Sequence, residues 1–254
     1  MRYPCFRGSF LLTSAWRFAC LATNLGGNLH NEVLWLVFIL FDLSAVLLAF
    51  RLWGKTGLYA MIACAGIICN IQVVVTIELF GLVATLGNIV YASIFLSTDI
   101  LSEYFGVREA RKGVWIGFFS LVWATFAMQF AIHFIPDESD FMLVHVKQIF
   151  SLMPRVVLAS LVAYIVSQHH DIWAFAFWKQ KTSGKHLWFR NNASTFVSQL
   201  ADSIVFTLIA FLGVFETEVL LEITATTFIL KLIVAVIDTP FLYISRIIAR
   251  DKLL

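Results

Sequence analysis

Charged residues are scarce in this sequence. Lys, Arg, Asp and Glu make up 13% of its 254 residues, whereas apolar residues make up 60%. A soluble domain carries about 25% charged and 45–50% apolar residues. Most of the apolar side chains must therefore face lipid or other membrane helices. This composition excludes a soluble globular protein and indicates one that crosses the membrane several times.

The motifs of several enzyme classes are also missing. The four cysteines form no CxxC pair and the six histidines show no HxxxH or HExxH spacing, so no zinc site is indicated. No GxxxxGK[ST] motif is present, so the chain cannot hydrolyse ATP through a P-loop. We therefore expect neither an enzyme nor a bound cofactor or metal. No nucleic-acid partner is expected either.

Seven stretches reach the roughly 20 mostly apolar residues that a membrane-spanning helix needs. They are Val33–Leu52, Gly57–Ile77, Leu82–Ser102, Gly113–Ile135, Ile149–Ser167, Asn192–Val214 and Glu222–Ile247. The strands of a membrane β-barrel would be shorter and would alternate strictly. We therefore predict an all-α polytopic membrane protein, a bundle of about seven transmembrane helices.

The charged loops predict how the chain is oriented. Lys and Arg follow the first, third, fifth and seventh stretches, whereas acidic or uncharged residues follow the others. The positive-inside rule then places the basic loops and the C-terminus in the cytoplasm. Residues 1–31, whose short apolar run is broken by Arg17, are predicted to form a poorly ordered or interfacial tail ahead of one transmembrane domain, residues 32–254.

Ionisable residues within the apolar stretches are candidates for function, since each costs about 2.5–3.5 kcal/mol at the centre of a membrane helix. They are Asp42, Asp99, Arg155, Asp202, Lys231 and Asp238, with Glu103 nearer the membrane edge. The deep acids outnumber the deep bases, so pairing cannot neutralise all of them. A cationic or hydrogen-bond-donating ligand, a bound ion or a proton could supply the difference.

The sixth stretch has the clearest pattern. Its polar residues recur every three to four positions, which places them in one stripe along the helix. They are Asn191, Ser194, Thr195, Ser198, Gln199 and Asp202. Small polar residues also allow close helix packing, but Gln199 and Asp202 favour a polar cavity.

Other polar residues leave alternatives open. Lys231 and Asp238 could form an ion pair, although seven residues is a long separation for direct contact. Arg155 either extends to the membrane surface or points inward and holds a carboxylate or carbonyl oxygen. Asn70 is a weaker candidate, because single amides often bridge helices.

Asp99 and Glu103 lie four residues apart on one helical face, where like charges repel. A neighbouring positive or proton-donating group would explain the arrangement: Lys231, Arg111 or a ligand. Glu103 is favoured to form a salt bridge with Arg108 or Arg111, whereas Asp99, one turn deeper, is expected to face the interior.

Four segments carry a resemblance to a known family. They are FLSTDILSEYFGVREARKG (95–113), PRVVLASLVAYIVSQHHD (154–171), RNNASTFVSQLADSIVFTLIAFLG (190–213) and LKLIVAVIDTPFLY (230–243). In this order and at these separations they resemble the queuosine precursor transporters, vitamin-uptake-like transporters of the inner membrane. The resemblance covers about residues 57–248. It implies a plasma-membrane protein with a core of six helices, to which the first stretch adds one.

The resemblance also implies import of 7-deazaguanine bases for tRNA modification, by a secondary carrier or facilitator. The bases are 7-cyano-7-deazaguanine, 7-aminomethyl-7-deazaguanine and queuine. In such a site Asp202 would accept the N1–H and exocyclic amine of the base, and Asp99 would meet a cationic aminomethyl group. Gln199, Lys231 or Arg155 would donate to the base carbonyl.

The substrate-binding residues that we expect combine the family pattern with the polar residues singled out above. They are Asn70, Asp99, Glu103, Arg155, Ser194, Gln199, Asp202, Lys231 and Asp238. Two other functions stay open at this point: the membrane subunit of an ATP-driven vitamin-type importer, and a non-transporting sensor or scaffold. The partners expected are the small-molecule base and the lipid bilayer, and a homo-oligomer is compatible with the sequence.

Overall fold

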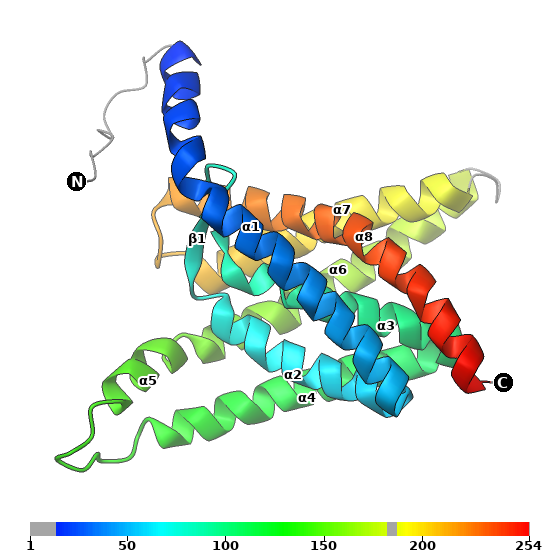
Figure 1. The fold of residues 1–254 in the computed structure, drawn as a ribbon, viewed down its shortest axis with the longest axis horizontal. Helices are drawn as coiled ribbons and strands as arrows, with labels where there is room; N and C mark the ends of the chain where they lie inside the picture. Colours follow the sequence, from blue (N-terminus) through cyan, green and yellow to red (C-terminus); the bar gives the residue numbers. More distant parts are fainter. Residues whose placement is uncertain (1–13, 182–186, 254) are drawn as a thin grey trace.

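The structure is a computed structural model in which residues 14–181 and 187–253 are described; side chains are described from residue 30 onward, apart from many between 168 and 195 and a few near the C-terminus. Helices dominate this part of the chain (Figure 1). They are α1 (Ser14–Trp53), α2 (Lys55–Gln72), α3 (Tyr91–Phe105), α4 (Val107–Ala131), α5 (Leu143–Phe150), α6 (Met153–Lys181), α7 (Leu187–Phe211) and α8 (Thr217–Leu253).

The predicted fold class is confirmed. Each of the seven predicted stretches overlaps one of the longer helices, and α5 is an additional short helix between α4 and α6. Within the described residues, four helical segments are long and apolar enough to cross a membrane, and α7 contains a shorter apolar segment, Phe196–Phe211. The chain is therefore an all-α membrane protein with several spans.

The boundaries of the second and third predicted stretches are wrong. Helix α2 ends at Gln72 and α3 begins only at Tyr91. Between them lie two antiparallel strands, β1 (Thr76–Leu79) and β2 (Leu82–Thr85), and a 3-10 turn, η1 (Leu86–Asn88). Phe80 and Gly81 join the strands with φ angles of 52° and 76°. Two consecutive positive φ angles are the geometry of a tight two-residue hairpin.

Helix α1 begins earlier than the first predicted stretch. It starts at Ser14, so residues 14–31, which were assigned to a tail, continue the first stretch as helix. Figure 1 shows this part of α1 bending away from the other helices. The division into a tail and a transmembrane domain stays a prediction.

The two ends of the bundle differ in charge. The hairpin, α5 and the α7–α8 turn lie at one end, which we call the hairpin end (Figure 1). The α1–α2 turn, the α3–α4 turn and the end of α8 lie at the other, which carries Lys55, Arg108, Arg111, Lys112 and Arg246 and which we call the basic end. The cytoplasmic location of the basic end stays a prediction.

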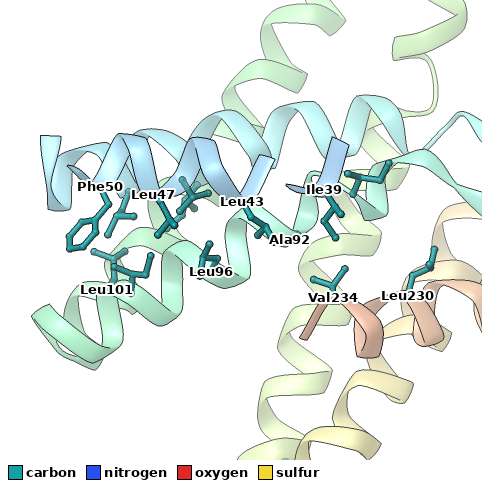
Figure 2. Close-up of a cluster of buried hydrophobic side chains, with 14 of the residues drawn as sticks. Ile39, Leu43, Leu47, Phe50, Ala92, Leu96, Leu101, Leu230 and Val234 are labelled. Carbon is teal, nitrogen blue, oxygen red and sulfur yellow. The ribbon is translucent and has the colours of Figure 1, made fainter. Parts of the chain in front are cut away.

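The largest hydrophobic cluster joins α1 to α2, α3 and α8 (Figure 2). Its fully or nearly fully buried members include Ile39, Leu43, Leu47, Phe50, Ala92, Leu96, Leu101, Leu230 and Val234. Helix α1 is thereby packed on one side of the bundle. The residues of this cluster do not come from α6 or α7, so the space between α2, α4, α6 and α7 is lined mostly by other side chains.

Helix α4 has two contrasting faces. Gly113, Gly117, Leu121 and Thr125 recur every four residues and are buried. The two glycines let α4 approach Ile62 of α2 closely, because a Cβ at either position would press against that side chain. The opposite face is exposed and aromatic, with Trp115, Phe119, Trp123, Phe126 and Phe130. Of the candidate spans, α4 is the least buried.

Candidate functional site

A cavity of about 470 Å³ lies inside the bundle. It is lined from α2, η1, α3, α4, α6, α7 and α8. Lining residues near the basic end, such as Asp99, Ser102 and Arg111, are exposed, whereas Val73 and Gly87 at the hairpin end are buried. The cavity therefore reaches the surface at the basic end and is closed at the hairpin end.

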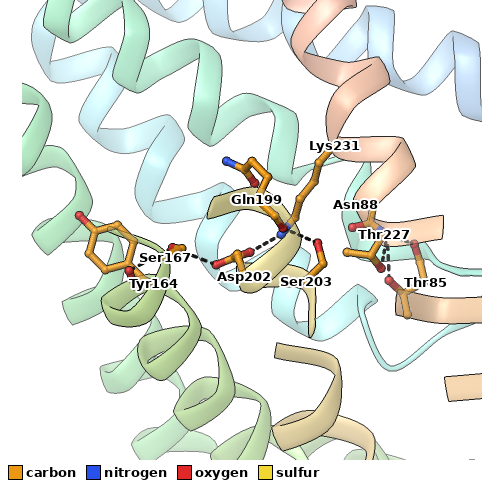
Figure 3. Close-up of polar contacts among 9 residues, drawn as sticks. All are labelled: Thr85, Asn88, Tyr164, Ser167, Gln199, Asp202, Ser203, Thr227 and Lys231. Atoms are coloured by element: carbon orange, nitrogen blue, oxygen red, sulfur yellow. Dashed lines mark hydrogen bonds and ion pairs between the residues drawn. The ribbon is translucent and has the colours of Figure 1, made fainter. Parts of the chain in front are cut away.

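An ion pair lies in the wall of this cavity (Figure 3). The Lys231 ammonium of α8 donates to the Asp202 carboxylate of α7, and the two side chains are only 8% and 14% exposed. The Ser167 hydroxyl of α6 donates to the other carboxylate oxygen of Asp202 at 3.4 Å. The pair therefore joins three helices, and burial makes each charge dependent on its partner.

Amide side chains connect further helices around the cavity. Asn70 donates to the Gly66 carbonyl oxygen (2.7 Å) within α2 and accepts from the Ser160 hydroxyl of α6 (3.0 Å). Asn88 of η1 donates to the hydroxyls of Thr85 (3.0 Å) and Thr227 (3.4 Å) (Figure 3). The amide of Asn70 thus bridges α2 and α6, and that of Asn88 bridges β2 and α8.

The structure brings together only part of the predicted site. Asn70, Asp99, Gln199, Asp202 and Lys231 line the cavity. Lys231 pairs with Asp202, so the alternative pairing with Asp238 is wrong. Asp238 is buried without lining the cavity. The side chain of Ser194 lies outside the described residues.

Glu103 lies at the exposed basic end, away from the cavity lining. Its carboxylate pairs with Arg246 of α8 at 3.3 Å. The predicted salt bridge with Arg108 or Arg111 is therefore wrong, because a basic residue from a distant part of the chain lies closer. Ion pairs this exposed contribute little to stability.

Arg155 holds carbonyl oxygens, one of the two alternatives left open by the sequence. Its Nε donates to the Ile209 oxygen at 2.6 Å and its Nη2 to the Leu212 oxygen at 2.5 Å. Both oxygens lie at the C-terminal end of α7, where backbone acceptors lack partners within the helix. Arg155 does not line the cavity and instead ties the start of α6 to the end of α7.

Replacing Arg155 with alanine is expected to destabilise the protein by about 2 kcal/mol, since two hydrogen bonds from a charged donor are lost. The midpoint of thermal unfolding in detergent should fall by roughly 4–8 °C. Arg246→Ala, which removes an exposed ion pair, is the control and should change it little. Equal midpoints for the two variants would contradict this role of Arg155.

Several residues of the cavity wall were not among the predicted site residues. Ser160, Tyr164 and Ser167 of α6 recur every three to four residues, so they form a second polar stripe beside that of α7. That spacing was a signal in the sequence. Tyr91 of α3 gave no such signal, and its ring centroid lies 5.4 Å from the Lys231 ammonium.

Comparisons with known proteins agree with the earlier resemblance. Residues 85–245, more than half of the chain, match the family described as putative vitamin uptake transporter. A probable queuosine precursor transporter of Bacillus subtilis is 42% identical over 219 residues, which cover 86% of this chain and 96% of that protein.

A second relative has the same name. A probable queuosine precursor transporter of Haemophilus influenzae is 30% identical over 133 residues, covering 52% of this chain and 54% of that protein. No solved structure matches the chain. Since the first match covers 86% of this chain and 96% of that relative, the chain belongs to the queuosine precursor transporter family, a family of multi-pass membrane transporters.

Proposed function

We propose that this chain imports a queuosine precursor across the plasma membrane for tRNA modification. The substrates proposed are 7-cyano-7-deazaguanine, 7-aminomethyl-7-deazaguanine and queuine. Two relatives named as probable queuosine precursor transporters support this proposal. The structural observation that carries it is a cavity with charged and amide side chains in its wall, open at one end, within a bundle of membrane helices.

The dimensions and chemistry of the cavity suit such a base. Its volume of about 470 Å³ lies within the range of about 300–1,000 Å³ that is common for small-molecule sites. The proposed site consists of the predicted residues that line it, Asn70, Asp99, Gln199, Asp202 and Lys231. Asp99, at the open mouth, is suited to a cationic aminomethyl group. Glu103, Arg155 and Asp238 are left out because they lie outside the lining.

The proposed mode is alternating access by a secondary carrier or facilitator. With the basic end in the cytoplasm, the cavity of this structure faces inward. The hairpin end is closed where η1 packs on α2, since a Cβ on Gly87 would overlap the Cys69 carbonyl oxygen. Import requires this end to open so that the base can enter from outside.

The test is the queuosine content of tRNA in cells that neither make nor import the precursors. Cells expressing this chain and fed each base in turn should regain queuosine with at least one of them. The Asp202→Ala variant should not restore it, whereas Arg246→Ala should. Mass spectrometry of digested tRNA measures the product. No restoration by well-inserted unmodified chain would overturn the proposed cargo.

Energy coupling is tested in the same cells. A proton-coupled carrier should lose its initial uptake rate when a protonophore is added, whereas a facilitator should keep it. Co-purification of the chain with an ATPase would instead support an ATP-driven importer.

A further inference from the structure

Polar groups in the cavity wall divide into those with partners and those without. Asp202 has Lys231 on one oxygen and Ser167 on the other. Asn70 and Asn88 are bonded to neighbouring helices or strands. These side chains are thus already engaged in contacts within the protein.

Some other polar side chains of the cavity wall make no contact of this kind within the described part of the chain. Among the described residues, no side-chain hydrogen bond is made by the Gln199 carboxamide or by the hydroxyls of Tyr91 and Tyr164. Gln199 lies three residues before Asp202 on α7, and Figure 3 shows its amide pointing away from that carboxylate. The carboxamide therefore presents one free donor group and one free acceptor to the cavity.

Aromatic rings line the same space. Tyr91 lies beside Lys231, and Tyr164 of α6 lies beyond Ser167 on the other side of Asp202 (Figure 3). Phe118 packs edge-on against Tyr164, with ring centroids 5.0 Å apart. A planar base next to Gln199 would therefore meet aromatic surface as well as the free amide.

We infer that Gln199, rather than Asp202, forms the hydrogen bonds to the N1–H and C6 carbonyl edge of the base. Its carbonyl oxygen accepts the N1–H of the deazaguanine ring, and its NH₂ donates to the C6 carbonyl oxygen. Asp202 remains paired with Lys231 and holds α7 against α8. This inference rests on the proposed function, because it needs a base with a lactam edge.

Binding of the base by a carboxamide and binding by a carboxylate differ in one testable respect. A carboxamide uses N1–H and the C6 carbonyl, so it does not need the 2-amino group. A carboxylate such as that of Asp202 would accept from N1–H and the 2-amino group together, and loss of that amine would leave an acceptor without its donor. For Asp202 to bind in this way, Lys231 would also have to lose its buried counter-charge.

The experiment measures uptake of labelled 7-cyano-7-deazaguanine in competition with unlabelled base or with the same base lacking its 2-amino group. With the unmodified chain the two competitors should be equally effective within about threefold, because the amine has no partner in this arrangement. A loss of about tenfold or more on removal of the amine would overturn the inference.

Two variants sharpen this result. Gln199→Ala should weaken both competitors by about 5–150-fold, the value of one bidentate pair. Gln199→Glu replaces the donor by an acceptor, so it should retain uptake and newly prefer the competitor with the 2-amino group by about tenfold or more. Gln148→Glu, the same change on the exposed face of α5, is the matched control and should alter neither preference.

The outcomes also separate this inference from the proposed function. If the unmodified chain takes up no deazaguanine at all, the proposed cargo is wrong and the inference fails with it. If uptake is normal and Gln199→Glu leaves the preference unchanged, the cargo stands and only the role of Gln199 is overturned.

Discussion

Asp202→Ala is expected to lower the free energy of unfolding by about 3–5 kcal/mol, because it leaves the Lys231 ammonium buried without a counter-charge. The midpoint of thermal unfolding in detergent should fall by roughly 6–20 °C, and uptake of the base should be lost along with the stability. Lys231→Met should have a similar effect, since it leaves the carboxylate unpaired.

The double variant Asp202→Ala/Lys231→Met is the informative control. It contains neither charge, so no unpaired buried ion remains and most of the lost stability should return. If the role of Asp202 is only to hold the helices together, and not to bind the base, partial uptake should return too. Additive losses in the double variant would show that the two side chains act independently, contrary to the structure.

Cross-linking of the hairpin end to α8 is expected to reduce uptake nearly to background. Thr85 and Thr227 both contact the Asn88 amide, at 3.0 and 3.4 Å, so cysteines at these positions lie within reach of a short bifunctional thiol reagent. In a background without the native cysteines, the cross-link would fix β2 to α8 and keep this end closed. Alternating access requires it to open.

The cross-linked protein should keep its binding site. Inside-out vesicles should still bind the labelled base, because the cavity opens at the basic end. A reductant-cleavable linker should restore uptake after reduction, and each single-cysteine variant treated with the reagent should retain it. Uptake at the rate of the unmodified chain by fully cross-linked protein would show that the hairpin end does not need to open.

The helices were predictable because their apolar runs are long, but residues 73–90 were not. This stretch has only Glu78 as a charged residue, so hydropathy alone could not separate strands from helix. Gly81 and Gly87 were the local signals, since glycine within an apolar run often marks a turn or a close approach of two backbones. Here Gly81 completes the hairpin turn and Gly87 packs against α2.

The sequence predicted which residues line the cavity better than it predicted which of them form ion pairs with one another. The cost of polar groups in lipid selected Asp202, Lys231 and Gln199, all of which line the cavity. Spacing along one helix could not show that Lys231 meets Asp202, which is 29 residues away. Nor could it show that Glu103 meets Arg246, which is 143 residues away. Such pairs depend on which helices are neighbours.

The aromatic outer face of α4 has a consequence for what a displacement of this helix would cost. In water, a helix with Trp115, Phe119 and Trp123 on its surface could not shift without changing the apolar surface area exposed to solvent, which costs free energy. In a bilayer, hydrocarbon tails surround those rings before and after a displacement, so no such term opposes it. The contacts that a displacement must break and remake lie on the inner side of α4. There Gly113 and Gly117 approach Ile62 of α2, and Phe118 packs against Tyr164 of α6. The lipid-facing side of α4 therefore adds no hydrophobic cost to a displacement of this helix, and the thickness and fluidity of the bilayer should influence the rate of any transport step in which α4 moves.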